Sequence, residues 1–442
     1  MNILYIHTHD SGRYFEPYGY PLRSPRIMQL AREGVLFRQA FSAAPTCSPS
    51  RAALLTGMSP HSCGMLGLAH RGFSLMDYSW HIVYQLNSIG YETVLSGIQH
   101  VASHNEGVGY TRILGNSSYD MSRSFDFDTV EYDTYNACRV ADYIRDRKPG
   151  DRPFFLSFGM FNTHRLFPPV HKDIDPDYIR PPFPLQDTRE NREDFAGYLT
   201  SARIVDSCVG TVMDALMESG MKEQTIVIFT TDHGIPFPEM KCTLYDTGIG
   251  VTLILRYPAN PMAGHVCDAL VSHVDLYPTL CDLIGTEKPG RLQGLSLLPL
   301  MEGKKDSVRE EVFSEVTYHA AYEPMRCIRT ARYKLIKRFD DNLDVIPANM
   351  DDCSGKDFLV NSGYLNAQHH REALFDLYLD PLERINRIGC SDYRRIYSDL
   401  NRRLMSWMER TDDPLFRGRV GKPEGAFANR QDCLSPGDDL FE

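Results

Sequence analysis

Four short apolar runs that each end in a cluster of polar side chains are the feature that most constrains the fold. They cover residues 3–6, 93–95, 154–158 and 226–229. They alternate with stretches of helical apolar spacing, such as 24–33, 80–89 and 194–219. This alternation predicts a parallel sheet with helices on both faces. Because ligands bind beyond the carboxyl ends of such strands, we expect the four polar clusters to converge on one site.

The expected secondary structure changes near residue 325, from alternating strands and helices to hairpin strands. Segments 327–330 and 333–336 resemble hairpin strands, and a helical run covers 393–410. We therefore expect an α/β fold. A large, mixed and mostly parallel sheet lies between helices in residues 1–325, and a smaller antiparallel sheet with one packed helix forms residues 326–442. The length of 442 residues accommodates two unequal units of this kind.

Composition excludes several classes of protein. The chain has 42% hydrophobic and 24% charged residues, as in globular proteins and unlike fibrous or disordered ones. A net charge of −11 argues against a nucleic-acid partner. No apolar run approaches the ~20 residues that span a bilayer, so we expect no membrane partner. The start of the sequence lacks the features of a secretory signal, and its eleven cysteines form no Cys-x-x-Cys pair, which predicts a cytoplasmic protein.

The most specific segment begins at Cys47 and reads Cys-Ser-Pro-Ser-Arg-Ala-Ala-Leu-Leu-Thr-Gly. We expect Ser48 to cap a helix that begins at Pro49 and ends at Gly57. Cys47 then lies at a helix N-terminus, which favours an anion and an activated nucleophile. A single cysteine is more often a small buried apolar residue. Arg51 lies one turn along and can reach back toward Cys47, which favours the catalytic interpretation.

This segment resembles the signature of the type I, formylglycine-dependent sulfatases of the alkaline-phosphatase superfamily. Further segments resemble the heparan N-sulfatase (sulfamidase) branch of that family, namely 232–238, 244–245, 324–326 and 374–377. The resemblance implies an alkaline-phosphatase-like fold. It also implies that a formylglycine-generating maturation enzyme oxidises Cys47 to formylglycine, whose hydrate attacks sulfur.

Two predicted strand ends each carry an adjacent histidine and aspartate, His9-Asp10 and Asp232-His233. Each pair alone fits a turn or a helix cap equally well, but together with Cys47 they indicate the ligands of a divalent metal ion. The family has Asp-Asp at the position of His9-Asp10, and the sulfamidase branch has Asp-Asn at the position of Asp232-His233. Each of the two pairs in this chain therefore contains one imidazole more than its counterpart. Imidazole suits Mn²⁺ or Zn²⁺, whereas Ca²⁺ prefers oxygen ligands, so we favour a transition metal and keep Ca²⁺ as an alternative.

Three further positions follow from the resemblance. It implies that Lys241 binds the sulfate oxygens, that His164 is the general acid at the leaving oxygen, and that His100 hydrogen-bonds the formylglycine hydroxyl. Each of the three also fits a purely structural or solvated role. The family has a lysine where this chain has Ile98. A metal bound by two neutral imidazoles keeps more positive charge toward the substrate, which we expect to replace that lysine in part.

The sequence therefore predicts a hydrolase that cleaves a sulfate ester or sulfamate of a small sulfated saccharide. Because Ile98 stands where the family has a lysine, two alternatives to a sulfatase stay open. One is a phosphonate monoester or phosphodiester hydrolase of the same superfamily, and the other is a non-catalytic binding protein with a sulfatase fold. The sugar and the position of its sulfate stay open. A homo-oligomer is compatible with the sequence.

Overall fold

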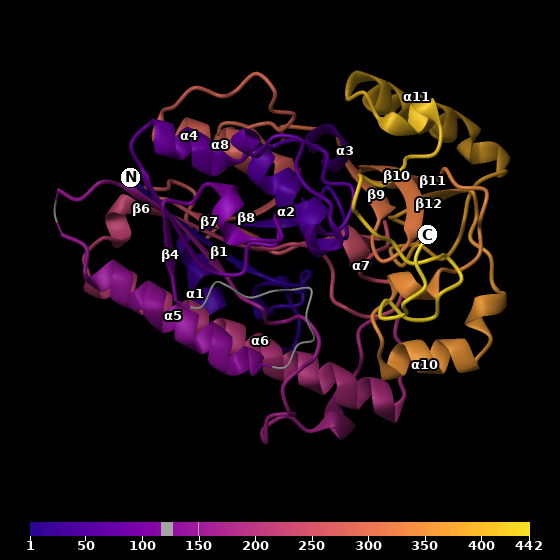
Figure 1. The fold of residues 1–442 in the computed structure, drawn as a ribbon, viewed down its shortest axis with the longest axis horizontal. Coiled ribbons are helices and arrows are strands. Elements are labelled where there is room, and N and C mark those ends of the chain that lie inside the picture. Colours follow the sequence, from indigo (N-terminus) through magenta and orange to yellow (C-terminus); the bar gives the residue numbers. More distant parts are fainter. Residues whose placement is uncertain (116–126, 149) are drawn as a thin grey trace.

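A computed structural model describes residues 1–115, 127–148 and 150–442 of the chain (Figure 1). Its larger sheet has the strand order β4-β3-β5-β1-β6-β7-β2-β8. Strand β7 runs antiparallel to its neighbours β6 and β2, and the other pairs in this sheet are parallel. The strands are β1 (Asn2–Thr8), β2 (Val35–Phe41), β3 (Glu92–Gly97), β4 (Arg112–Leu114), β5 (Phe154–Gly159), β6 (Thr225–Thr231), β7 (Leu253–Arg256) and β8 (Val266–Ser272). The expected mixed, mostly parallel sheet is confirmed.

Helices cover both faces of this sheet, because its strands are apolar on both sides (Figure 1). In β1, Ile3 and Tyr5 pack on one side, whereas Leu4 and Ile6 pack on the other. The first face carries α2 (Cys47–Thr56), α4 (Ile82–Ser88) and α8 (Leu276–Ile284), and the second carries α1 (Pro25–Glu33), α5 (Thr129–Arg145) and α6 (Arg189–Glu218). Four shorter helices are α3 (Pro60–Cys63), α7 (Asp246–Ile249), α9 (Leu298–Met301) and α10 (Ser354–Asn361). Within the described residues, no helix has the length and apolar character that a bilayer crossing requires.

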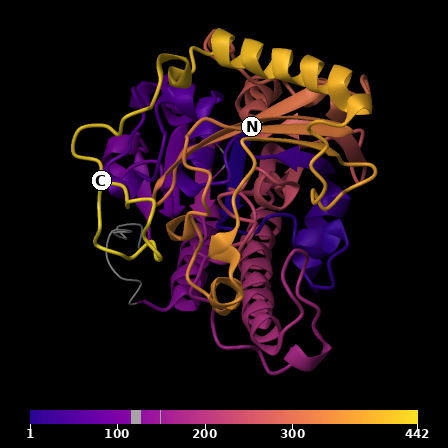
Figure 2. The same ribbon diagram turned by 90° about the vertical axis from the view of Figure 1, so that its right-hand side faces the viewer.

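The second sheet is antiparallel and has the order β12-β11-β10-β9. Helix α11 (Arg394–Arg410) lies across its outer face, where Leu404 and Trp407 pack on Ile328 and Leu335 (Figure 2). The expected small sheet with one helix is confirmed. Its strands are β9 (Glu311–Tyr318), β10 (Tyr322–Thr330), β11 (Tyr333–Arg338) and β12 (Glu372–Asp376). A domain boundary between residues 325 and 326 would lie inside β10. The expected division of the chain into two domains at that point stays a prediction.

The start of α2 differs from the expected one. The helix begins at Cys47 rather than Pro49, and its N-cap residue is Thr46, which makes no side-chain cap hydrogen bond. The prediction that Ser48 caps the helix is wrong, because its hydroxyl instead accepts a hydrogen bond of 2.9 Å from the backbone N–H of Ala69. The helix ends as predicted, with Gly57 in the left-handed region at φ 68°.

Arg326, which belongs to one of the sulfamidase-like segments, ties the second sheet to the chain that follows α11. Its guanidinium is fully buried and donates hydrogen bonds of 2.6 and 3.0 Å to the carboxylate of Asp413. Glu315 of β9 lies 3.7 Å away and also contacts the imidazole of His61 in α3. Arg326 therefore neutralises buried acidic groups where three segments meet.

Replacing this guanidinium leaves the buried carboxylates without their cation, so Arg326→Met is expected to lower the free energy of unfolding by about 3–5 kcal/mol. The matched control is Arg417→Met, because Arg417 pairs with Asp412 in the open, where both side chains are more than 70% exposed. A pair of that kind contributes about 0–1 kcal/mol. Urea unfolding followed by tryptophan fluorescence measures both values, and equal losses would contradict the role of Arg326.

Candidate active site

The polar clusters that follow β1, β3, β5 and β6 lie together at one edge of the larger sheet. These four strands are neighbours, with β1 between β5 and β6 and β3 beside β5. The ring centroid of His9 lies 4.6 Å from that of His164, 5.7 Å from that of His100 and 6.5 Å from that of His233. The parallel strand order thus brings together residues that are more than two hundred positions apart in the sequence.

The candidate metal ligands are buried and lie around Cys47. Donor atoms of His9, Asp10, Cys47 and Asp232 all lie within 4.8 Å of one another. Nδ1 of His9 is 2.8 Å from Oδ1 of Asp10 and 3.3 Å from Oδ2 of Asp232. His233 lies outside that set of four, but its Nε2 is 3.3 Å from Oδ1 of Asp10 and 3.4 Å from Sγ of Cys47.

Asp232 joins the ends of β1 and β6 to helix α2. Its Oδ1 accepts the backbone N–H of Asp10 at 2.8 Å, and Asp10 has a left-handed backbone at φ 56°. Its Oδ2 accepts two hydrogen bonds, of 2.9 and 3.2 Å, from the guanidinium of Arg51. Burial alone would raise the pKa of Asp232, but the charges of His233, Arg51 and His9 hold it well below its usual range. The carboxylate therefore stays ionised.

Burial opposes the predicted activation of the Cys47 thiol by the helix N-terminus. Cys47 is 2% exposed, and its burial raises the pKa of the thiol well above the usual value. The charge of Lys241 opposes this shift, but Asp10 and Asp232 add to it. Arg51 binds Asp232 directly and so does not serve chiefly to activate the sulfur.

Lys241 lies inside the site and not on a solvated loop. Its side chain is 4% exposed, and Nζ donates hydrogen bonds of 2.8 Å to Asp10 and 3.0 Å to Asp351. Burial lowers the pKa of Lys241, but the two carboxylates outweigh it and raise that pKa well above the usual value. The ammonium is thus a fixed positive charge beside the candidate metal ligands.

Asp351 and His319 are residues of this site that the sequence analysis missed. Asp351 lies in the segment after β11, and His319 lies in the turn between β9 and β10. His319 is 5% exposed, and burial followed by the charge of Lys241 lowers its pKa well below the usual value. No motif marks either residue, and only the packing of the second sheet on the first unit brings them to the site.

The two remaining histidines are held by polar partners. Nδ1 of His164 lies 2.5 Å from the backbone oxygen of Arg165, so Nε2 faces Lys241 at 3.5 Å. Burial, with the charge of Lys241 next in size, lowers the pKa of His164 to about 4. Nε2 of His100 lies 3.0 Å from Nδ1 of His70, another residue that the sequence analysis did not single out.

Ile98 is buried in an apolar cluster with Tyr132 and Phe161. The position where the family has a lysine is therefore part of the packing in this chain.

The residues present fit a bound divalent metal ion. The buried carboxylates of Asp10 and Asp232 and the partly buried carboxylate of Asp351 face two permanent cations, Arg51 and Lys241. One negative charge is therefore left without a balancing cation. Two carboxylates and two imidazoles are a donor set that suits Mn²⁺ or Zn²⁺. We therefore regard His9, Asp10, Asp232 and His233 as the residues that would hold the ion.

Comparisons with known proteins show which family the chain resembles. The model of the Sulfatase family matches residues 1–286, and the model described as N-sulphoglucosamine sulphohydrolase, C-terminal matches residues 239–352. Human N-sulphoglucosamine sulphohydrolase is 28% identical, over 98% of this chain and 94% of that protein. An ulvan-active sulfatase from Formosa agariphila is 27% identical, over 96% of this chain and 82% of that protein.

A solved structure in complex with its substrate, D-glucosamine-2-N,6-O-disulfate, shares the fold. It superimposes with a TM-score of 0.71 at 18% identity and covers 93% of this chain and 98% of that chain. A phosphonate monoester hydrolase from Agrobacterium radiobacter has the same fold at 19% identity, so the fold alone does not separate sulfatases from the phosphonate alternative. The model of the Sulfatase family matches well over half of the chain, and the phosphonate hydrolase is the weaker match. This chain, with Cys47 at the start of α2 among paired His and Asp residues, belongs to the sulfatase family of sulfuric ester hydrolases.

Proposed function

We propose that this chain is a formylglycine-dependent sulfatase that removes sulfate from an ester or sulfamate of a small sulfated saccharide. The observation that carries the proposal is the position of Cys47. It is the first residue of α2, it opens an unbroken signature segment, and its Sγ lies 3.4 Å from His233 within the candidate metal-binding group. Its maturation would require a formylglycine-generating enzyme as partner. Formylglycine, once formed and hydrated, supplies one oxygen to attack sulfur and a second to expel sulfate.

The ionised groups around Cys47 have separate tasks in this proposal. Asp10 and Asp232, with His9 and His233, would hold a divalent ion, Mn²⁺ or Zn²⁺ before Ca²⁺, which supplies positive charge to the sulfate oxygens. Arg51 keeps Asp232 ionised and in place through its two hydrogen bonds.

Lys241 binds a sulfate oxygen in this proposal. Its ammonium has three N–H donors, and Asp10 and Asp351 accept two of them. The third faces Nε2 of His164 at 3.5 Å and turns from there toward the substrate in this proposal. Asp10 and Asp351 thus orient the cation that replaces water around the sulfate group.

His164 is placed to serve the leaving group. Because Nδ1 faces the backbone oxygen of Arg165, Nε2 is the nitrogen that faces the site. A bound sulfate offsets the charge of Lys241, which favours a proton on Nε2, and His164 then gives that proton to the departing oxygen or nitrogen. His100, which lies beyond the carboxyl end of β3, orients the hydrated formylglycine.

The relatives support a sulfated sugar as the substrate class. Human N-sulphoglucosamine sulphohydrolase and the ulvan-active sulfatase both align over nearly the whole chain. The C-terminal match to the N-sulphoglucosamine sulphohydrolase model contains Lys241, His319 and Asp351, which all lie at the site. The match to this model and the human relative support an N-sulfated or O-sulfated hexosamine.

Cys47→Ala is expected to abolish turnover of sulfated hexosamines without unfolding the chain, because it removes the source of the nucleophile. Mass spectrometry of the active protein should show an aldehyde in place of the thiol. Cys47→Ser should give at most one turnover, since a single oxygen can attack but cannot expel sulfate. Cys281→Ala, at a buried cysteine of α8, is the control and should keep its activity. Wild-type rates for Cys47→Ala would refute the assignment.

His164→Ala should slow poor leaving groups far more than good ones, because an aryl oxygen needs little help from a proton. The expected loss is about 10²–10⁴-fold on a sugar sulfate and much smaller on an activated aryl sulfate. The measurement is kcat/KM for both substrates with each protein. Equal losses on both would indicate structural damage and remove His164 from the reaction.

A further inference from the structure

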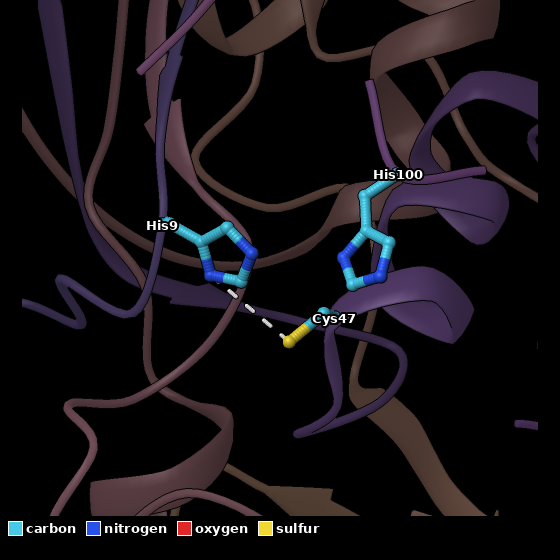
Figure 3. Close-up of side chains that lie close together, drawn as sticks. All are labelled: His9, Cys47 and His100. Atoms are coloured by element: carbon cyan, nitrogen blue, oxygen red, sulfur yellow. Dashed lines mark hydrogen bonds between the residues drawn. The ribbon is translucent and has the colours of Figure 1, made fainter. Parts of the chain in front are cut away.

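His9, His100 and Cys47 form a second set of donor atoms, which contains no carboxylate. One ring nitrogen of each histidine and Sγ of Cys47 lie within 4.8 Å of one another. All three side chains are buried, at 0%, 4% and 2% exposure. Figure 3 shows the rings of His9 and His100 facing each other, with Cys47 reaching toward the space between them. Two imidazoles and a thiol are therefore directed at one point.

Two buried nitrogens of this set have nothing to bind. Nε2 of His9 and Nδ1 of His100 make no hydrogen bond to any of the described residues. A buried polar atom without a partner costs about 1–3 kcal/mol, so proteins seldom leave two of them side by side. A ligand that accepts the lone pairs of both nitrogens would remove this cost.

The other nitrogen of each ring is already held in place. Nδ1 of His9 lies 2.8 Å from Oδ1 of Asp10, so its N–H donates to that carboxylate and Nε2 keeps the lone pair. Nε2 of His100 lies 3.0 Å from Nδ1 of His70, whose ring stacks on it with centroids 5.3 Å apart. Histidines that bind metal ions are oriented in this way, through a hydrogen bond at the nitrogen that is not a ligand.

We propose that, as long as Cys47 keeps its thiol, His9, His100 and Cys47 bind one Zn²⁺ ion. Two imidazole nitrogens and a thiolate suit zinc and cobalt and are poor ligands for Ca²⁺ or Mg²⁺. The thiol releases its proton to solvent as the bond between sulfur and zinc forms. The site differs from the one proposed for catalysis, because it uses Nε2 of His9 and Nδ1 of His100 and needs no carboxylate. Conversion of Cys47 to formylglycine removes the sulfur and abolishes the site.

The test is a Co²⁺ titration of the full chain, produced without the maturation enzyme and shown by mass spectrometry to carry the Cys47 thiol. One equivalent of Co²⁺ should give a thiolate-to-cobalt charge-transfer band, and Zn²⁺ should displace it. Cys47→Ser should lose the band, and His100→Ala should weaken binding at least 100-fold. His70→Ala removes only the orienting partner and should weaken binding about 10- to 100-fold.

Two controls separate this site from other ways of binding cobalt. Cys138→Ser removes an exposed thiol and should leave the band unchanged. His233→Ala removes a ligand of the carboxylate site that lies outside this donor set, and it should also keep the band. A band that survives His100→Ala but disappears in His233→Ala would overturn the proposal, because the thiol would then belong to the carboxylate site.

Thermal melting of each variant shows that it is folded, and His100→Asn replaces His100→Ala should the latter not fold. The titration measures metal binding and not hydrolysis. Its failure would therefore leave the proposed sulfatase activity untouched, and loss of that activity would leave this site untouched.

Discussion

The carboxylate of Asp232 is the contact on which the site depends. It accepts the backbone N–H of Asp10, the backbone N–H of His233 and the guanidinium of Arg51, and so connects β1, β6 and α2. Without it the two strand ends and the signature helix would have no common partner, and Cys47 would not be held against His9 and His233. The left-handed backbone of Asp10 is maintained by this hydrogen bond, because an aspartate adopts that conformation only where its surroundings favour it.

The charges of the site follow from this arrangement. Arg51 and Lys241 are buried cations, and each is paired with carboxylates that would otherwise be costly to bury. Burial raises the pKa of the Cys47 thiol, so the sulfur itself is a poor nucleophile in this environment. The proposed maturation to formylglycine would replace this sulfur with the two oxygens that the proposed reaction uses.

Histidines occupy several positions of this site. His9 and His233 lie at the candidate metal ligands, and His70 supports His100. The ring of His9 has a second nitrogen, Nε2. Together with Nδ1 of His100, it forms a pair of buried nitrogens beside Cys47 that have no hydrogen-bond partner among the described residues. The metal sites that we propose for the two states of Cys47, with thiol and with formylglycine, both use nitrogen donors, which suit transition metals.

The sequence by itself determined the alternation of strands and helices, the position of the polar clusters at strand ends, and the residues of the signature. Each of these depends on neighbours along the chain, through side-chain periodicity and the constraints of helix termini. The antiparallel insertion of β7, the start of α2 at Cys47 and the role of Arg326 as a buried cation were decided by tertiary structure.

The same is true of Asp351, His319 and His70. None of them lies in a motif, because their task is set by the packing of the second sheet and of the α3–β3 segment against the larger sheet. Their ionisation and hydrogen bonds depend on groups between 30 and more than 100 positions away, such as the pair of Lys241 with Asp351. Local sequence determines which elements form, whereas burial and long-range charge determine what their side chains can do.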